Sequence, residues 1–170
     1  MTTTTKIIIV AAIVLLLTTA TAMGVSAKGL NFIKDFEGER LKSYRDTGNI
    51  WTIGFGSTYN HDAKRKVQEG DIIDKETALR WLRLDAGKFA TGVKKLVKVP
   101  INQNQLDSLT SFAYNLGEGA LRSSTLLKKV NANPLDAQIR NEFQKWIYAD
   151  GKKLNGLLRR RNAEADLYFS

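Results

Sequence analysis

The spacing of hydrophobic residues changes character several times along the chain. Residues 7–27 carry no charge and are densely apolar up to Leu17, after which Thr, Ala and Gly become common. As a helix, this stretch could cross a hydrocarbon core of about 30 Å, although its second half adds little to the free energy of insertion. We therefore divide the chain into residues 1–27, a signal-anchor or transmembrane segment, and residues 28–170, one folded domain.

Three interpretations of the N-terminal segment are open. An uncleaved signal-anchor agrees with its length, whereas Val25-Ser26-Ala27 after an apolar run also resembles the cleavage site of a signal peptide. A helix buried in the core is the third. The first two place Lys28 and the residues after it outside the cytoplasm, because the early positive charge, Lys6, stays inside.

The pattern after residue 28 begins with a helix and a hairpin. Leu30, Ile33 and Phe36 follow one another at three-residue steps and Gly38 comes soon after, which predicts a short helix closed by a glycine. Residues 47–49, Thr-Gly-Asn, separate two β-prone segments, which predicts a small antiparallel hairpin.

Helical spacing dominates the rest of the chain, and we expect everything after the hairpin to be helical. Capping residues mark the expected helix starts: Asp74, Asn102 with Gln105, Ser123 or Ser124, and Asn133 with Pro134. The last helix covers residues 157–169, and three aromatic residues are expected in the core: Trp81, Phe112 and Trp146. This order predicts an α+β fold, with a small antiparallel sheet lobe, a mainly helical lobe and a cleft between them, preceded by a hydrophobic N-terminal helix.

Two carboxyl groups near the hairpin suggest hydrolytic chemistry. Glu37 ends the first helix, where partial burial would raise its pKa and let it act as a general acid, whereas Asp46 lies among polar neighbours at the turn and should stay ionised. Such a pair is what cleavage of a glycosidic bond requires. Thr52 could help Asp46 to orient a water molecule, and Gly54 and Gly56 would let a sugar ring approach the backbone.

A structural interpretation of the same residues is also possible. Asp-Thr-Gly-Asn is an ordinary turn sequence, and Glu37 could merely pair with Arg40. The composition narrows the alternatives, since the chain has no cysteine and one histidine, His61. Disulfides, thiolate metal sites and histidine-rich metal centres are therefore excluded, and we expect no metal site.

The segment "FEGERLKSYRDTGNIWTIGFGST" decides between these interpretations. Its order, Glu37, eight residues, Asp46, five residues, Thr52, resembles the catalytic segment of phage lysozymes of glycoside hydrolase family 24. The likeness extends to "SFAYNLGEGALRSSTLLKKVN" and "WIYADGKKLNGLLRRRNAEADLY", so that it covers nearly all of residues 29–168. It implies a lysozyme-like fold and hydrolysis, without a cofactor, of the β-1,4 bond between N-acetylmuramic acid and N-acetylglucosamine in peptidoglycan.

The resemblance also implies roles for individual residues. Glu37 would be the acid, Asp46 would assist the attack of water and Thr52 would position that water, with inversion and carboxyl groups roughly 6.5 to 9.5 Å apart. Tyr44 would lie beside the acid. Four further residues would line the sugar cleft: Gly56, Thr58, Tyr114 and Thr125. A basic partner of the acid is expected among Lys152, Lys153 and the arginines of residues 159–161.

The N-terminal segment resembles the signal-arrest-release anchors of some phage endolysins. The resemblance implies a monomer exported to the periplasm, tethered at first to the bacterial inner membrane through residues 7–27, and then released. Some such enzymes are restrained by a cysteine switch, which this chain cannot form. Restraint by the membrane itself, or by incomplete folding near Glu37, is the alternative.

The net positive charge of the folded domain agrees with an anionic substrate. Of the 26 basic residues only Lys6 precedes residue 28, and all 17 acidic residues follow it, so residues 28–170 carry a net charge of +8. Cell-wall polymers with peptide carboxylates satisfy this charge, and without a nucleic-acid-binding motif we expect no nucleic acid partner. Part of the late basic cluster is expected on a solvated helix face, paired with Glu164 and Asp166. A non-catalytic wall-binding protein and a lytic transglycosylase are the alternative functions.

Overall fold

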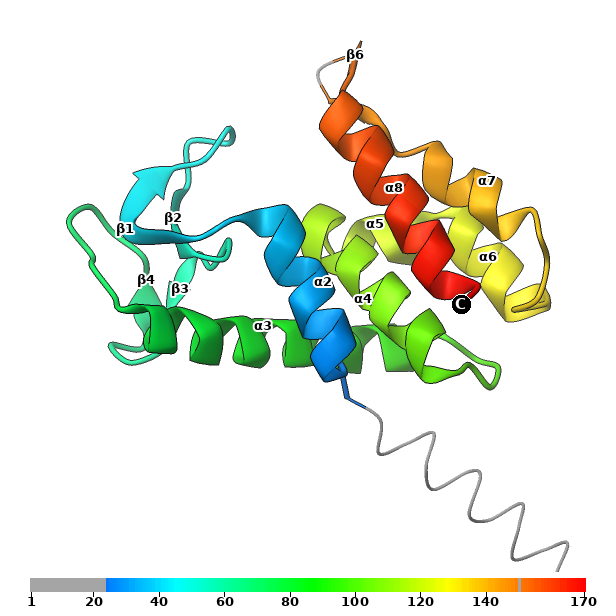
Figure 1. Ribbon diagram of the computed structural model, residues 1–170, viewed down its shortest axis with the longest axis horizontal. Coiled ribbons are helices and arrows are strands. Elements are labelled where there is room, and N and C mark those ends of the chain that lie inside the picture. Colours follow the sequence, from blue (N-terminus) through cyan, green and yellow to red (C-terminus); the bar gives the residue numbers. More distant parts are fainter. Residues whose placement is uncertain (1–23, 150) are drawn as a thin grey trace, which may run out of the picture.

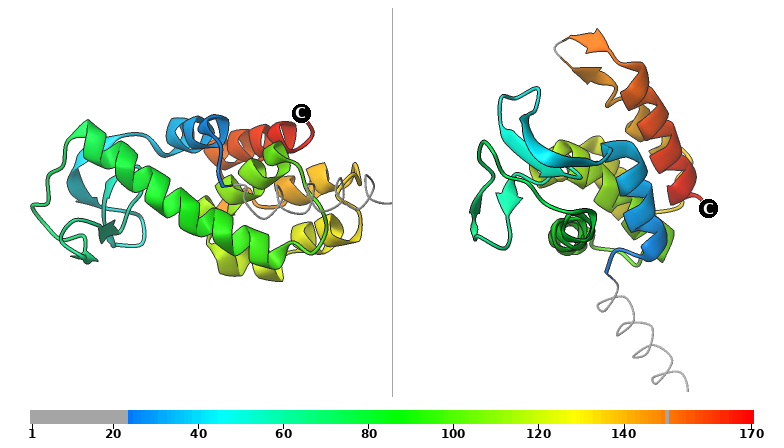
Figure 2. Two further views of the ribbon diagram at one scale, coloured as in Figure 1. Left: turned by 90° about the horizontal axis from the view of Figure 1, so that it is seen from below. Right: turned by 60° about the vertical axis from the view of Figure 1, so that its left-hand side comes forward.

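The computed structural model describes residues 24–149 and 151–170, which form a sheet lobe and a helical lobe (Figure 1). Helix α3 (Lys75–Leu96) runs along one side of both lobes and links them, as the left view of Figure 2 also shows. The sheet lobe contains β1 (Arg40–Arg45), β2 (Trp51–Gly54), β3 (Tyr59–Asn60) and β4 (Arg65–Lys66). The helical lobe contains α4 (Gln103–Leu116), α5 (Glu118–Ser123), α6 (Thr125–Ala132), α7 (Ile139–Gln144) and α8 (Asn155–Tyr168). The hairpin of β5 (Tyr148–Ala149) and β6 (Lys152–Lys153) projects from the start of α8.

Helix α2 (Ala27–Glu37) leads from the helical lobe to the sheet lobe (Figure 1). It ends at Gly38, whose φ of 71° lies in the left-handed region that a glycine enters without strain. On its inner face, Ile33 is fully buried against Phe55 and Ala78. The short helix and its glycine end, both predicted from the sequence, are confirmed.

Strands β1 and β2 form the predicted antiparallel hairpin. Tyr44 pairs with Thr52 and Arg45 with Trp51, and residues 47–49 make the turn between the strands. Asn49 adopts a φ of 59° there, a conformation that asparagine tolerates better than most residues. The hairpin therefore carries both Asp46 and Thr52 into the sheet lobe at fixed register.

Most predicted helix starts are confirmed by side-chain caps. Asp74 accepts a hydrogen bond from the N–H of Thr77, and Asn102 and Gln105 bond each other's backbone N–H groups reciprocally. Ser124, rather than Ser123, caps α6. These signals are local, so they can be recognised in the sequence alone.

Two expectations about the later chain were wrong. The residues after the first hairpin are not all helical, because β3 pairs with β4 and β5 with β6. No helix starts at Asn133-Pro134 either, since α7 begins at Ile139. The side chain of Asn133 accepts a bond from the N–H of Leu135 and makes a turn, which leaves Leu135 75% exposed.

The helical lobe is organised around α4. Its central residues Leu109 and Phe112 are fully buried and pack against side chains from α5 to α8. Trp146 packs against this cluster, while Trp81 lies in a separate cluster under the sheet lobe with Ile53. The expected core positions of the three aromatic residues agree with this arrangement.

The hydrophobic N-terminal segment falls mostly outside the described residues. Among residues 24–149 and 151–170, no helix combines the length and the apolar character needed to cross a membrane. Its last residues belong to the folded domain, where Ser26 caps α2 and Val25 packs against the cluster around Ile33.

Candidate active site

Glu37, the last residue of α2, carries the carboxyl group around which the site is built. The helix ends directly after it, and the chain continues through Gly38 into β1, so Glu37 stands at the end of α2 that leads to the sheet lobe (Figure 1). Its side chain is 18% exposed, which leaves the carboxyl group accessible from one side.

Arg160 of α8 is the basic partner of Glu37. Its Nη1 atom donates a 2.7 Å hydrogen bond to Oε1 of Glu37, and its side chain is only 5% exposed. Nη2 of the same guanidinium lies 3.3 Å from both the carbonyl oxygen and Oγ of Ser111 in α4. Of the expected basic candidates, Lys152 and Lys153 lie exposed on β6 instead.

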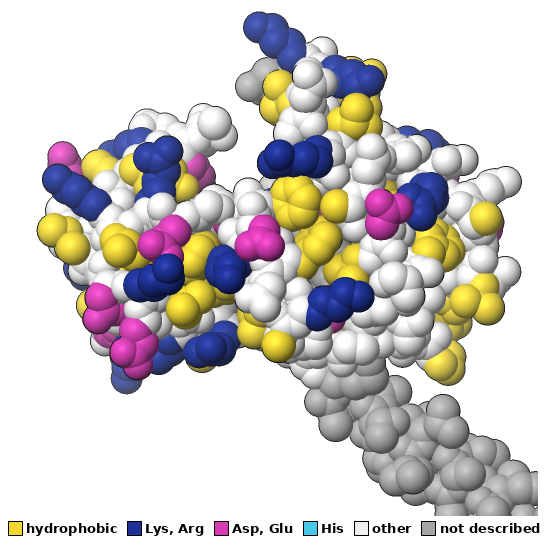
Figure 3. All heavy atoms as spheres, in the orientation of Figure 1, with side chains coloured by type: hydrophobic (Ala, Val, Ile, Leu, Met, Phe, Trp, Pro, Cys, Tyr) yellow, Lys and Arg dark blue, Asp and Glu magenta, His cyan; other side chains and the backbone are white. Residues whose placement is uncertain are grey.

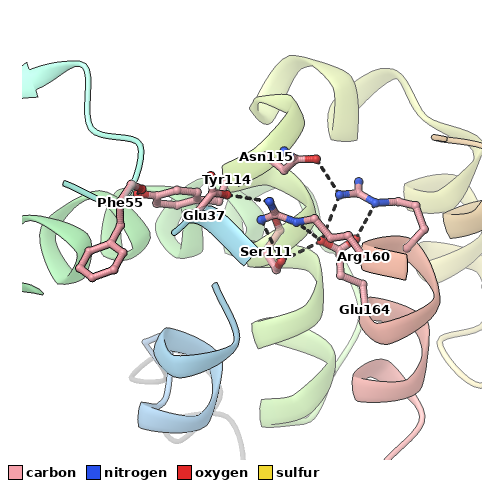
Figure 4. A network of polar contacts seen from close by, with 8 residues as sticks. Glu37, Phe55, Ser111, Tyr114, Asn115, Arg160 and Glu164 are labelled. Carbon is pink, nitrogen blue, oxygen red and sulfur yellow. Dashed lines mark hydrogen bonds and ion pairs between the residues drawn. The ribbon is translucent and has the colours of Figure 1, made fainter. Parts of the chain in front are cut away.

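Behind Arg160 lies a second carboxylate, Glu164, which is fully buried (Figure 4). Its Oε1 accepts hydrogen bonds from Nε of Arg160 at 3.1 Å, Oγ of Ser111 at 2.7 Å and Nη2 of Arg161 at 3.3 Å. Its Oε2 forms an ion pair with Nε of Arg161 at 3.1 Å. Arg161 also donates to Asn115.

This network corrects part of the expectation of a solvated helix face, on which Arg159 and Asp166 do lie exposed. Glu164, Arg160 and Arg161 are buried between α4 and α8, because Ser111 and Asn115 supply polar partners inside the lobe. Burial raises the pKa of Glu164, while the guanidinium groups of Arg161 and Arg160 favour its ionised form. Burial also lowers the pKa of Arg161 to about 10.

The backbone of the sheet lobe forms the other wall beside Glu37. Gly56 has a φ of 92°, and a Cβ atom there would lie 3.4 Å from Oε2 of Glu37 and 3.7 Å from the ring of Tyr114. The hydroxyl of Tyr114 donates to the carbonyl oxygen of Phe55 at 2.7 Å, which ties α4 to the sheet lobe at this point. Burial raises the pKa of Tyr114, so its hydroxyl keeps the proton that it donates.

Asp46 and Tyr44, two further residues singled out in the sequence, lie on the hairpin of β1 and β2. Oδ1 of Asp46 accepts the N–H of Ile50 at 2.8 Å, which fixes the carboxylate at the turn. Burial raises the pKa of Tyr44; the positive charge of Arg40 opposes this, and the negative charges of Glu37 and Asp46 reinforce it.

Comparison with known proteins identifies the family. A family model described as phage lysozyme matches residues 34–164, most of the chain. The chain belongs to the phage lysozyme family.

Similar proteins agree with the phage lysozyme match. An endolysin of Bacillus phage B103 is 45% identical over 150 residues, covering 87% of this chain but 55% of that protein, so the chain spans about half its length. An endolysin of Acyrthosiphon pisum secondary endosymbiont phage 1 is 40% identical over 152 residues, covering 87% of this chain and 99% of that protein. The solved structure of an endolysin from Escherichia coli O157:H7 phage FAHEc1 has a TM-score of 0.78 and 39% identity, covering 88% and 95% of the two chains.

More distant phage lysozyme relatives are named SAR-endolysins. Those of bacteriophage PS119 and enterobacteria phage P21 are 31% and 30% identical over 131 residues, which is 77% of this chain.

The structure brings together some of the residues singled out in the sequence, while Asp46 and Thr52 lie on the hairpin, where Thr52 is buried and pairs with Tyr44. Tyr44, Gly56 and Tyr114 lie around Glu37, whereas Thr58 and Thr125 are exposed and take no part in the contacts described around the acid. Cleft-lining roles for these five residues stay predictions, as do the catalytic roles of Glu37, Asp46 and Thr52.

Sequence reasoning missed Ser111 and Glu164 as parts of this phage lysozyme site. Glu164 stands four residues after Arg160 and therefore on the same helix face, which was the available signal. Its burial depends on α4, which the sequence of α8 does not reveal.

The surface agrees with a substrate groove in this phage lysozyme. Figure 3 shows a notch between the sheet lobe and the column formed by α8 and β6, with Lys and Arg side chains on both sides. Among residues 24–149 and 151–170, no three His, Cys, Asp or Glu side chains are grouped as metal ligands would be.

Proposed function

We propose that this chain is an endolysin that hydrolyses the β-1,4 bond between N-acetylmuramic acid and N-acetylglucosamine in bacterial peptidoglycan, and so lyses the host cell. One observation carries the proposal: Glu37 is a partly buried carboxyl group whose Oε1 is held by Arg160 at 2.7 Å and whose Oε2 faces Gly56, and the hairpin that carries Asp46 starts three residues after it. Family membership and the names of the relatives support it.

The two oxygens of Glu37 have different surroundings, which suggests how the acid works. Oε1 accepts the hydrogen bond from Arg160, while Oε2 faces Gly56, where no side chain stands in the way. A proton on Oε2 would pass to the glycosidic oxygen as the bond to C1 of the muramic acid breaks, and the bonding electrons would stay with the departing glucosamine. Arg160 then stabilises the carboxylate that remains. The protonation state expected of Glu37 stays a prediction.

Asp46 and Thr52 would handle the water molecule. Asp46 would remove a proton from the water as its oxygen attacks C1 on the face opposite the leaving group, which inverts the anomeric centre. The hydroxyl of Thr52 donates to the carbonyl oxygen of Ile50 at 3.1 Å, so its lone pairs remain to accept a hydrogen bond from the water. The acid, the base and water suffice for this reaction.

The decisive variant is Glu37→Gln, which keeps the shape and removes the acidic proton. The release of reducing ends from purified peptidoglycan should fall by a factor of about 10² to 10⁴, while cosedimentation with the wall stays unchanged. Glu39→Gln, two residues along the chain in an exposed ion pair with Lys75, is the matched control and should keep full activity.

The alternative functions predict other outcomes. A non-catalytic wall-binding protein would pellet with peptidoglycan but release no ends even as wild type. A lytic transglycosylase would leave anhydro-muramic ends, which mass spectrometry distinguishes from the reducing ends of hydrolysis. NMR of the first product formed should show the α-anomer, as inversion of a β-linkage requires.

We also propose that the chain is exported to the periplasm as a monomer, held in the inner membrane through residues 7–27, and then released. The uncharged, weakly apolar composition of this segment supports the proposal, and so do the relatives named SAR-endolysins.

A further inference from the structure

We infer that Glu164 is a positioning residue for the acid: it fixes the guanidinium of Arg160 from behind and balances the charge of the buried arginine pair, so that Glu37 is oriented without facing two uncompensated cations. This inference rests on the proposed role of Glu37 as the acid. Two features of the network carry it: its geometry and its charge.

The geometry shows a guanidinium held at all three of its nitrogen atoms. Nη1 of Arg160 bonds Glu37, Nε bonds Glu164, and Nη2 lies against Ser111 (Figure 4). Since a guanidinium is planar and rigid, fixing Nε also fixes the direction in which Nη1 points. Glu164 thus acts on Glu37 through one intervening group, and Ser111 locks Glu164 in turn by donating to the same Oε1 atom.

The charges of the four ionisable side chains in the network sum to zero when both glutamates are ionised. Arg160 and Arg161 supply two positive charges, and Glu164 and Glu37 supply two negative ones, in a region where Arg160, Arg161 and Glu164 are all buried. Buried charges interact strongly because little solvent screens them. Without the charge of Glu164, the carboxylate of Glu37 alone would face both guanidinium groups.

The other titratable groups facing Glu37 do not change this balance. Tyr44 of β1 and Tyr114 of α4 both feel its charge, and both have a raised pKa, so they are neutral when the enzyme works. Asp46 acts on the same tyrosine from the hairpin side. Arg161 of α8 also interacts with Glu37 electrostatically.

The variant Glu164→Gln tests the charge balance, because it removes the negative charge and keeps an oxygen acceptor. Two cations would then stabilise the ionised form of Glu37, so the acid loses its proton at lower pH. The alkaline limb of the kcat profile should move down by roughly one pH unit, and kcat on that limb should fall about tenfold. KM should stay within about twofold of wild type, because Glu164 lies behind Arg160 and does not reach the notch.

Arg161→Gln supplies the opposite change. It removes one cation and keeps Arg160 in place, so the alkaline limb should move up instead of down. The double variant, Glu164→Gln with Arg161→Gln, removes one charge of each sign and should return the limb toward its wild-type position. Loss of packing alone would shift the limb in neither direction.

Two controls complete the experiment. Asp166→Asn makes the same charge change on the same helix, but Asp166 is 70% exposed in an ion pair with Arg140, so its pH profile should match the wild type. Ser111→Ala is a neutral change for the case in which Glu164→Gln does not fold. It should lower kcat severalfold at unchanged KM, and an unchanged kcat would count against the inference.

The result that overturns the inference is a folded Glu164→Gln enzyme, checked by circular dichroism, whose pH profile and kcat equal those of the wild type. A lowered kcat with an unmoved alkaline limb would also overturn it, since that pattern indicates structural damage only. The Glu37→Gln chain assayed in parallel separates this failure from failure of the proposed function. If that variant keeps its activity, the acid has been misassigned; if it is inactive, only the role of Glu164 is lost.

Discussion

At residue 56 the backbone itself forms the wall of the site. Because Gly56 has no side chain, the position 3.4 Å from Oε2 of Glu37, where a Cβ atom would lie, is left without one. Arg160 bonds the other oxygen, Oε1. One oxygen of the carboxyl group is therefore held by a cation, and the other faces the glycine. A glycine is required here for two separate reasons, the left-handed φ and the space in front of the acid.

The variant Gly56→Ala separates those two reasons. We expect it to cost about 1–2 kcal/mol of stability through its left-handed φ, and to lower kcat/KM about tenfold because the new methyl group covers Oε2. Gly70→Ala is the matched control, because Gly70 has a φ of 82° but nothing within 4 Å of its Cβ position. Urea unfolding should show similar losses for both. Full activity of the Gly56→Ala enzyme would contradict the arrangement described around Oε2.

Sequence reasoning singled out Glu37 but could not choose its basic partner among the candidates. The spacing of Glu37 and Asp46 can be recognised from local sequence, and so can the glycines. Choosing Arg160 over Lys152 or Lys153 requires knowing which face of α8 packs against α4, and that is a property of the folded lobe. The same holds for Glu164, since an acidic residue among arginines reads as a surface ion pair until its burial is known.

At the level of elements, α2 carries Glu37 as its last residue, and the start of α2 is bonded to α4. We call the hydrogen bonds around Asp107 that join the two helices the clasp. Asp107 is fully buried and accepts hydrogen bonds from the N–H of Ser26 at 2.9 Å, from the Ser26 hydroxyl, and from Gln103 at 2.8 Å. Gln103 also donates to the carbonyl oxygen of Gly24. The two helices approach so closely that a Cβ at Gly29 would lie 2.5 Å from Cγ of Asp107.

Ser26→Ala should therefore cost more than the loss of an ordinary helix cap. We expect about 2 kcal/mol, of which about 1 comes from the cap and the rest from the lost partner of buried Asp107. Ser124→Ala, at the cap of α6, removes a cap but takes no hydrogen-bond partner from a buried carboxylate, so it should cost about 1 kcal/mol. Denaturant unfolding of the two variants measures the difference, and equal costs would show that the clasp contributes nothing.

Long elements with clear capping residues could be predicted from the sequence, and short elements could not. Helices α3 and α4 were predicted because their caps lie next to long apolar stripes, as Asp74 and Asn102 do. Strands β3 to β6 were missed because two residues show no periodicity. The start of α7 was misplaced because Asn133 caps a turn rather than a helix, a choice that depends on the packing of the following residues.

At the scale of the whole molecule, the clasp bears on how the chain is processed. Cleavage after Ala27 would remove Ser26, and with it the cap of α2 and two hydrogen bonds to Asp107. We therefore expect the exported, soluble chain to retain Ser26, as an intact anchor that has left the membrane would. N-terminal sequencing and intact mass of the periplasmic protein test this, and a chain that starts at Lys28 would contradict it.

Because α2 follows Ser26 directly, the length of α2 limits how far Glu37 can lie from the end of the N-terminal anchor. Helix α2 has 11 residues, which is about 16 Å of helix, and Glu37 is its last residue. In the proposed tethered state, in which the anchor leads directly into α2, Glu37 would thus stay within about that distance of the end of the anchor, next to the lipid headgroups. Peptidoglycan strands farther from the membrane than this would be out of reach of Glu37. Release from the bilayer would therefore change which strands the enzyme can cut, without any change in its chemistry.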